Sequence, residues 1–190
     1  MTVPGILLPD RAFVLIRHGE TDANRAGLIV GRLEAQLTDR GRAEAAALAG
    51  IDWPETPLLF VSPQARARET AALAFPGLPR SVVDGLRERD WGRLEGRPLA
   101  EMIPREATPE AGEAWADMLA RVAAALRFAL QDPRGGLPVL VAHSGTIRAV
   151  RRLTGGSEHG PRAANAAPIL FTPGPGLWAE RLWPRPGTED

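Results

Sequence analysis

Short apolar runs alternate with longer mixed segments along this chain, and the alternation predicts its elements. Apolar runs cover residues 12–16, 58–61, 81–83 and 139–142, and each is bounded by Gly, Pro or polar residues. Runs of this length with such boundaries are typical of strands buried in a parallel sheet. The segments between the runs are long enough to hold helices.

Helical periodicity occurs in two of those segments. Apolar residues recur at three- and four-residue spacing from Trp115 to Leu130, which predicts a long amphipathic helix that covers one face of the sheet. A second helix is predicted over residues 146–153, where Gly155 and Gly156 follow and end it.

Candidate capping residues mark two further helices. Thr38 is expected to be the N-cap of a helix over residues 42–49, because a Thr side chain can accept from a free backbone N–H. Ser62 is expected to cap a helix over residues 64–74, with proline following at the first helical position. The stretch 20–37 shows no periodicity and is expected to be a loop.

The end of the chain predicts a closing hairpin. Residues 167–171 and 177–182 are candidate strands on either side of a Pro-Gly-Pro-Gly turn. The tail 184–190 is expected to be frayed. Residues 98–109 read as an irregular insertion that holds one short helix.

Strands that alternate with helices indicate an α/β fold, and we expect a three-layer α/β/α sandwich with a mostly parallel central sheet. The length of 190 residues fits a single domain over 1–190, with a short cap insertion at about 95–115. A chain of this size buries roughly 70% of its unfolded surface and needs no covalent or metal support.

Composition excludes several classes of protein. The absence of cysteine excludes disulfides, thiolate zinc sites and cysteine nucleophiles. A formal net charge of zero argues against nucleic acid or an anionic membrane as partner. Residues 1–9 lack the features of a signal peptide, and no apolar run approaches the ~20 residues of a membrane span. We therefore expect a soluble cytoplasmic protein.

Charged and imidazole side chains follow three of the predicted strands. Arg17 and His18 follow the first strand, Arg66 lies in the first helical turn after the second, and His143 with Ser144 follows the fourth. Ligands of α/β sheets bind beyond the carboxyl ends of the strands, so we expect these residues to converge. Arginine forks and a helix N-terminus together favour an anion of phosphate size.

Phosphoryl transfer gives such residues definite tasks. A neutral imidazole is a nitrogen nucleophile, and arginines spread the charge of the phosphoryl oxygens. A departing alkoxide needs a proton, so a carboxylic acid should lie nearby. Among the candidate acids we favour Glu88, because it follows the third predicted strand in a loop that can fold over the site. The candidates are Glu20, Glu69, Glu88, Asp90 and Glu95.

Other hydrolase patterns are absent from the sequence. The segment around Ser144 lacks the Gly-x-Ser-x-Gly elbow of serine hydrolases, and no P-loop motif is present. Three histidines without paired spacing make a His-based zinc centre improbable. His159 lies in a Gly-rich loop and is expected to be solvated, whereas Trp91 is a candidate for the pocket wall.

Four segments together resemble the histidine phosphatase superfamily, the phosphoglycerate mutase-like fold. Residues 17–21 with Asn24 are similar to its RHGxTxxN signature, and residues 62–71 to its SPxxRAxxTA segment. Residues 86–96 are similar to LxExxxGxxEG, and 141–145 to the V(A/S)HGG-like segment, with Ser for the commoner Gly. The order of the segments matches that family, and they cover most of the chain.

The resemblance implies a role for each matching residue. His18 would be the nucleophile that becomes phosphohistidine. Arg17, Arg66 and His143 would bind the phosphoryl oxygens. Glu88 would protonate the leaving group and then activate water.

It also implies the surroundings of that site. Asn24 would lie on the pocket wall, and Ser144 would offer a backbone N–H to a phosphate oxygen. The implied activity is that of a histidine acid phosphatase-type phosphoric monoester hydrolase, with no metal and no organic cofactor. The implied partner is a small-molecule phosphate ester, and the homodimer found in many members is an allowed assembly.

Two departures from the family pattern bear on the substrate. Residues 31–38 form a shorter stretch than the usual GRxQGxxDxPLT, and this loop borders the pocket mouth. The cap at 95–115 is also shorter than in phosphoglycerate mutases. A short cap favours the entry of water, and hence hydrolysis, over transfer to a second acceptor. A mutase-type phosphotransferase and a non-catalytic phosphate-binding regulatory protein remain the alternatives.

Overall fold

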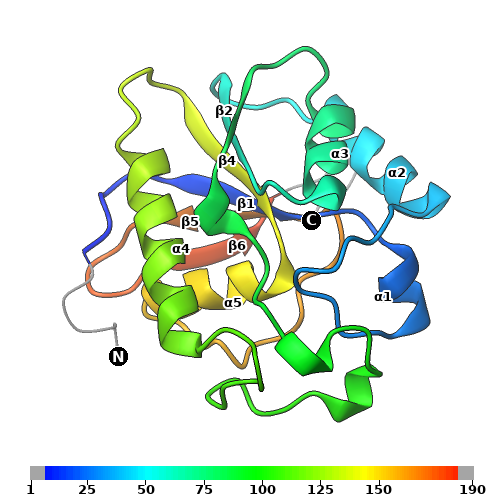
Figure 1. Cartoon of the computed structure of the whole chain (residues 1–190). Coiled ribbons are helices and arrows are strands. Elements are labelled where there is room, and N and C mark those ends of the chain that lie inside the picture. The colour runs from blue at the N-terminus through cyan, green and yellow to red at the C-terminus, as the bar shows by residue number, and fades with distance from the viewer. Residues whose placement is uncertain (1–6, 184–190) are drawn as a thin grey trace.

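A computed structural model describes residues 7–183 of the chain. Its centre is a six-stranded sheet in the order β3-β2-β4-β1-β5-β6 (Figure 1). The first four strands of this order run parallel, β5 is antiparallel to β1, and β6 is antiparallel to β5. The strands are β1 (Phe13–Arg17), β2 (Pro57–Val61), β3 (Arg80–Val82), β4 (Leu137–Ala142), β5 (Pro168–Thr172) and β6 (Ala179–Leu182).

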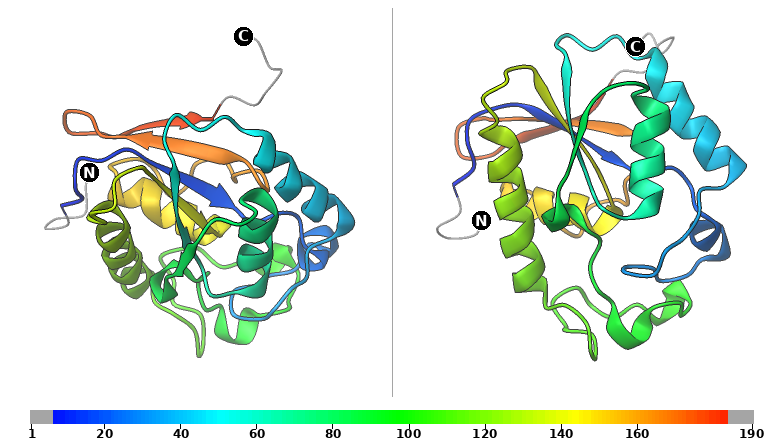
Figure 2. Two further views of the ribbon diagram at one scale, coloured as in Figure 1. Left: turned by 90° about the horizontal axis from the view of Figure 1, so that it is seen from above. Right: turned by 45° about the horizontal axis from the view of Figure 1, so that its top comes forward.

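Helices cover both faces of the sheet, as Figure 2 shows. The α-helices are α1 (Asp22–Ala26), α2 (Asp39–Ala46), α3 (Ala65–Ala74), α4 (Trp115–Leu130) and α5 (Ser144–Leu153). Short 3₁₀ turns are η1 (Ala47–Gly50), η2 (Asp84–Leu86), η3 (Gly92–Leu94) and η4 (Leu99–Glu101). No helix among residues 7–183 has the length and apolar character needed to cross a bilayer.

The alternation of side chains along β1 divides the core into two layers. Phe13 and Leu15 are fully buried against α4 and α5, whereas Val14 and Ile16 are buried against α3 on the other face. Both clusters are apolar, so each helix layer is bound to the sheet by the hydrophobic effect. The three-layer α/β/α sandwich with a mostly parallel sheet is therefore confirmed.

Most predicted elements are confirmed to within a few residues. The long helix spans Trp115–Leu130 as its periodicity predicted, and Thr38 caps α2 by accepting from the Gly41 N–H at 3.0 Å. The closing hairpin is formed by β5 and β6. The tail 184–190 lies outside the described residues.

Two local predictions were wrong. Ser62 is not the N-cap of α3, because Gln64 occupies that position and the helix begins at Ala65. The stretch 20–37 is not entirely loop, since Thr21 and Asn24 form a capping box that starts the short helix α1. Five helical residues are too few to produce a visible apolar periodicity.

The reversed direction of β5 brings one more segment to the functional edge of the sheet. Pro168 at the start of β5 pairs with Ile16 near the end of β1, and the Ala166 N–H donates to the Arg17 carbonyl at 2.9 Å. A parallel strand would have started at the opposite edge. The segment that precedes β5 therefore lies beside the residues that follow β1.

Candidate active site

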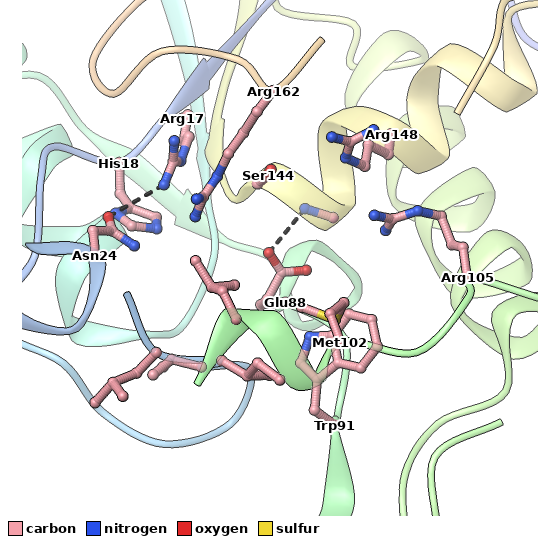
Figure 3. Close-up of a pocket in the computed structure, with 15 residues that line it drawn as sticks. Arg17, His18, Asn24, Glu88, Trp91, Met102, Arg105, Ser144, Arg148 and Arg162 are labelled. Atoms are coloured by element: carbon pink, nitrogen blue, oxygen red, sulfur yellow. Dashed lines mark hydrogen bonds between the residues drawn. The ribbon is translucent and has the colours of Figure 1, made fainter. Parts of the chain in front are cut away.

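A cavity of about 250 Å³ opens at the carboxyl ends of β1 and β4 (Figure 3). One wall comes from the residues after these strands, and the other comes from the cap. The lining residues are Arg17, His18, Asn24, Leu28, Ile29, Val30, Glu88, Trp91, Leu99, Met102, Arg105, Ser144, Gly145, Arg148 and Arg162. This volume lies below the range of drug-sized pockets, so the cavity suits a small ligand.

His18 is held in one tautomer at the end of β1. Its Nδ1 lies 2.8 Å from the Gly19 carbonyl, which can only accept, so Nδ1 carries the proton and donates. The lone pair is therefore on Nε2. The backbone is fixed as well, because the Asn165 side chain donates to the His18 carbonyl at 2.8 Å.

Gly19 fixes the position of this loop against α2. Its N–H donates to the Thr70 hydroxyl at 3.0 Å, and a side chain at residue 19 would collide with the Gly41 backbone. Gly41 is equally constrained, since its own side chain would collide with the Glu20 backbone. Two glycines thus allow the two backbones to approach closely at the residues that directly follow His18.

The surroundings of His18 favour the neutral imidazole. Burial, with the positive charges of Arg66 and Arg17 next in importance, holds the pKa of His18 well below its usual range. His18 is buried, with 5% of the whole residue exposed, and it lines the cavity. At neutral pH its Nε2 is therefore an unprotonated nitrogen available as a nucleophile.

The Arg17 side chain lines the cavity beside His18 (Figure 3). Its terminal nitrogens donate to the Ala163 carbonyl at 2.8 Å and to Asn24 Oδ1 at 3.2 Å, while its buried Nε has no partner among the described residues. Burial, followed by the charge of Arg162, lowers the pKa of Arg17 to about 10. The guanidinium is still charged at neutral pH, and its Nε–H is a donor without an acceptor among the described residues.

His143 lies beside His18 at the N-cap of α5. The two ring centroids are 5.2 Å apart, and His143 Nε2 lies 2.7 Å from Ser62 Oγ. Its fully buried Nδ1 has no partner in residues 7–183. Burial and then the charge of Arg66 hold the pKa of His143 well below its usual range, so this ring is also neutral.

Arg66 lies near the site on α3, and it also binds the backbone of a neighbouring loop. Its terminal nitrogens donate to the carbonyls of Gly31 and Leu33 at 2.8 and 3.0 Å, and it is not among the cavity-lining residues. Burial lowers the pKa of Arg66, and its charge acts on both His18 and His143. The guanidinium therefore couples the shortened loop 31–38 to the histidine pair.

Glu88 faces the histidines across the cavity. One carboxylate oxygen accepts from the Gly145 N–H and the other from the Arg89 N–H, both at 2.8 Å (Figure 3). Its own N–H donates to Gln64 Oε1 at 2.8 Å. A side chain at Gly145 would collide with the Glu88 carboxylate, so only glycine permits this approach.

The family model of the histidine phosphatase superfamily (branch 1) matches residues 13–183. The chain belongs to this superfamily.

Both phosphatases and phosphoglycerate mutases occur among its relatives. An acid phosphatase of Mycobacterium tuberculosis is 34% identical over 150 residues, or 72% of each chain. A probable phosphatase of Schizosaccharomyces pombe is 38% identical over 91 residues, which are 46% of this chain and 44% of that relative. The chain thus covers less than half of this second relative.

The fold is similar to solved structures of the same group. The crystal structure of phosphoglycerate mutase from Thermus thermophilus aligns with a TM-score of 0.70 at 29% identity, covering 94% of this chain and 99% of the mutase. The resemblance to the histidine phosphatase superfamily that the motifs indicated is therefore confirmed.

Most of the site residues predicted for this histidine phosphatase superfamily member lie at one cavity. Arg17, His18, Asn24, Glu88 and Ser144 all line it. His143 and Arg66 lie directly behind this lining, where they act on His18. Trp91, the candidate for the wall, lines the cavity as well.

Four residues near the cavity were missed by the sequence analysis. Arg105, Arg148 and Arg162 line it, and Asn165 holds the backbone of His18. They come from the cap, from α5 and from the segment before β5, so no local motif connects them. The predicted hairpin did not specify the direction of β5 relative to β1, and it is this antiparallel pairing that delivers Arg162 and Asn165.

Two of the candidate acids other than Glu88 have structural tasks. Glu95 accepts from the N–H groups of Gly31, Arg32 and Leu33 at 2.9 to 3.2 Å, which fixes the start of the shortened loop 31–38. Asp90 accepts from the Arg32 side chain at 3.2 Å. Neither lines the cavity.

One cluster of possible metal ligands occurs in the part of the chain that the structure describes. Ligand atoms of Glu106, Glu158 and His159 lie within 4.8 Å of one another, and His159 Nε2 is 3.1 Å from Glu106 Oε1. None of the three lines the cavity, and the His159 side chain is 63% exposed. His159 is thus solvated, as its Gly-rich surroundings predicted.

Proposed function

We propose that this chain is a metal-independent phosphomonoesterase that hydrolyses a small organic phosphate through a phosphohistidine on His18. The observation that carries the proposal is the state of His18. Its Nδ1 proton is tied to the Gly19 carbonyl and its imidazole is neutral, so Nε2 is a free nucleophile in a cavity lined by arginines.

Two unused donors support a phosphoryl group beside this nitrogen. Arg17 Nε and His143 Nδ1 are buried and have no partner among residues 7–183. Buried donors without a partner are rare in folded proteins, and phosphate oxygens supply the missing acceptors. In this proposal the Ser62 hydroxyl donates to His143 Nε2, which places the His143 proton on Nδ1, the unused position. Arg66, Asn24 and the Ser144 N–H complete the binding site.

The first step transfers the phosphoryl group to the protein. His18 Nε2 forms a bond to phosphorus while the bond from phosphorus to the ester oxygen breaks. The ester oxygen takes the proton of Glu88 and leaves as an alcohol. Arg17 and Arg66 stabilise the charge on the phosphoryl oxygens during this transfer.

The second step regenerates the site. Glu88 is now a carboxylate and takes a proton from water as the water oxygen bonds to phosphorus. The bond from phosphorus to His18 Nε2 then breaks, and inorganic phosphate leaves. Glu88 ends the cycle protonated, so it serves both steps from one position.

Hydrolysis rather than intramolecular transfer is favoured by the short cap. The segment between η3 and α4 holds only the 3₁₀ turn η4 as regular structure. A mutase must retain and reorient a phosphorylated intermediate, which calls for a larger enclosing cap. An open, short cap instead admits water to the phosphohistidine.

The test is phosphate release from phenyl phosphate in excess EDTA. Wild type should release phosphate at the same rate with and without EDTA, and His18→Ala should be slower by about 10⁴-fold or more. The matched control is His159→Ala, which removes an exposed imidazole outside the cavity and should keep wild-type activity. Rapid quenching should trap an acid-labile phosphoryl group on wild type but not on His18→Ala.

Other outcomes would redirect the assignment. Loss of activity in EDTA that added metal restores would overturn the metal-independent mechanism. Absence of phosphate release, together with phosphoryl transfer between 2,3-bisphosphoglycerate and 3-phosphoglycerate, would favour the mutase alternative. Phosphate binding without either reaction would favour the regulatory alternative.

A further inference from the structure

A pair of arginines lies in the cavity on the far side of Glu88 from His18. Arg148 projects from α5, and Arg105 projects from the cap toward the same space (Figure 3). Arg17 and Arg162, in contrast, lie at the His18 end. The cavity thus has two cationic ends, with Glu88 and Ser144 between them.

Neither arginine of this pair is neutralised by the protein. Among residues 7–183, no carboxylate lies within 4.0 Å of either guanidinium. Arg105 has a cation–π contact with Trp115, at 5.5 Å from the ring centroid. Arg148 donates to the carbonyls of Glu158 and Gly160 at 2.6 and 2.8 Å. Those carbonyls orient the guanidinium without cancelling its charge.

The two positive charges also act on each other. Burial is the largest influence that lowers the pKa of Arg148, and the charge of Arg105 is the next. The carboxylates that act on Arg105 are those of Glu88, Glu106 and Glu158. Of these, only Glu88 lines the cavity. Glu88 is thus the one lining carboxylate that acts on this pair, and two positive charges exceed its single negative charge, so the pair is arranged to receive an anion.

The phosphoryl group does not account for this pair. If His18 is the nucleophile, the phosphoryl oxygens lie at the His18 end, where Arg17, Arg66 and Arg162 supply positive charge. The ester oxygen then lies near Glu88, its proton donor. Whatever reaches Arg105 and Arg148 must belong to the leaving alcohol.

We propose that Arg105 and Arg148 form a subsite for a second anionic group, so that the substrate is a phosphate monoester whose alcohol carries a carboxylate or a second phosphate. This inference rests on the proposed function, because it uses the phosphoryl position beside His18. The cavity of about 250 Å³ limits the spacer between the two anions to a short one. Leu28, Leu99 and Met102, which also line the cavity, offer apolar contact to that spacer.

The test compares esters that differ only at the far end. The probes are 2-phosphoglycolate, 3-phosphooxypropionate and 4-phosphooxybutyrate, each beside the alkyl phosphate of equal length. Ethylene glycol bisphosphate distinguishes a second phosphate from a carboxylate. For the spacer that fits, kcat/KM should exceed that of the matched alkyl phosphate by about 10-fold or more, since hydrogen bonds to charged groups are the stronger class.

The variant is Arg105→Gln, which keeps a long polar side chain and removes the charge. It should reduce the preference for the anionic ester by about 10-fold, mainly through KM, as expected for loss of one charge-assisted contact. The matched control is Arg97→Gln in the same cap, because Arg97 is exposed, is paired with Glu101 and does not line the cavity. The control should keep the wild-type preference.

The outcomes separate this inference from the proposed function. Equal kcat/KM for anionic and alkyl esters at every length would overturn the subsite. An equal loss on both esters in Arg105→Gln would do the same, since it would mark a structural role. If wild type hydrolysed no ester, phenyl phosphate included, the proposed function would fail. Calorimetry with a carboxyalkyl phosphonate and its alkyl analogue would then decide the subsite, and equal affinities would overturn it.

Discussion

The two walls of the cavity are built in different ways. On the strand wall, His18 and the two residues behind it, His143 and Arg66, are at most 5% exposed. The histidines directly follow β1 and β4, and Arg66 lies in the first turn of α3. The cap wall lies within the insertion 95–115, which contains only the 3₁₀ turn η4 as regular structure before α4 begins at Trp115. One wall belongs to the core of the fold, and the other belongs to an irregular segment outside the sheet. Figure 2 shows the path of that segment between the sheet and α4.

A single buried side chain holds much of the cap. Arg89 is fully buried, and its guanidinium donates to the carbonyls of Arg105, Ala107 and Glu113 at 2.8 to 3.0 Å. The strand wall has no such single support, because its residues are held by the whole sheet. The contrast indicates that the chemistry of the site depends on the core, whereas selectivity among substrates depends on a few cap contacts.

The largest expected effect comes from a change on the strand wall. Gly145→Ala places a methyl group against the Glu88 carboxylate and should displace it, which lowers kcat by about 10²-fold or more, the range of a general acid. Steady-state kinetics on an alkyl phosphate measure this. Glu88→Gln/Gly145→Ala should be no slower than Glu88→Gln alone, because both act through one group. Additive losses would contradict this positioning role.

A change in the cap should have a smaller and different effect. Arg89→Met removes three hydrogen bonds from a buried charge, so the free energy of unfolding should fall by about 2–3 kcal/mol. KM should rise more than kcat falls, because Arg105 loses its backbone anchor while His18 does not. Urea unfolding and kinetics measure the two effects. The exposed Arg93→Met is the control, and a fall in kcat alone for Arg89→Met would contradict the division between the walls.

A third test of the comparison is the dependence of stability on pH. Burial lowers the pKa of His18 and His143 below 6.5, so only the unfolded chain takes up their protons just below pH 6.5. Their contribution to stability is therefore complete above pH 6.5 and is lost as the pH falls toward the folded pKa values. The slope should be about 1.4 kcal/mol per pH unit for each histidine.

Urea unfolding between pH 7.5 and 5.5 measures this slope. His143→Gln should remove about half of it, whereas His159→Gln, which changes an exposed imidazole, should leave it as it is. A free energy of unfolding that does not change over this interval would contradict neutral buried imidazoles on the strand wall.

The same division explains what the sequence could predict. The strand wall is made of residues next to apolar runs, and the direction of a parallel strand fixes which edge its last residue reaches. Arg17, His18 and Ser144 were therefore predicted at one site and are found there. The positions follow from local patterns because a strand has one direction and one end.

The errors arise where a distant partner replaces a local one. Serine is a residue type that favours the N-cap position, but the Ser62 hydroxyl is hydrogen-bonded to His143, a residue far away in the sequence. Arg105 and Arg162 lie in irregular segments whose path depends on contacts such as those of Arg89. No periodicity along the chain records such contacts, so the cap wall was beyond prediction.

The central placement of β1 and β4 sets the timescale on which the site can open. Each has a neighbouring strand on both sides, so the amides of residues 14–17 and 139–142 should exchange with solvent deuterium only when the whole domain unfolds. The amides of the cap can exchange through local opening. The histidine pair should therefore persist for as long as the domain stays folded, whereas hydrogen bonds within the cap should break and re-form more often because that segment has little regular structure.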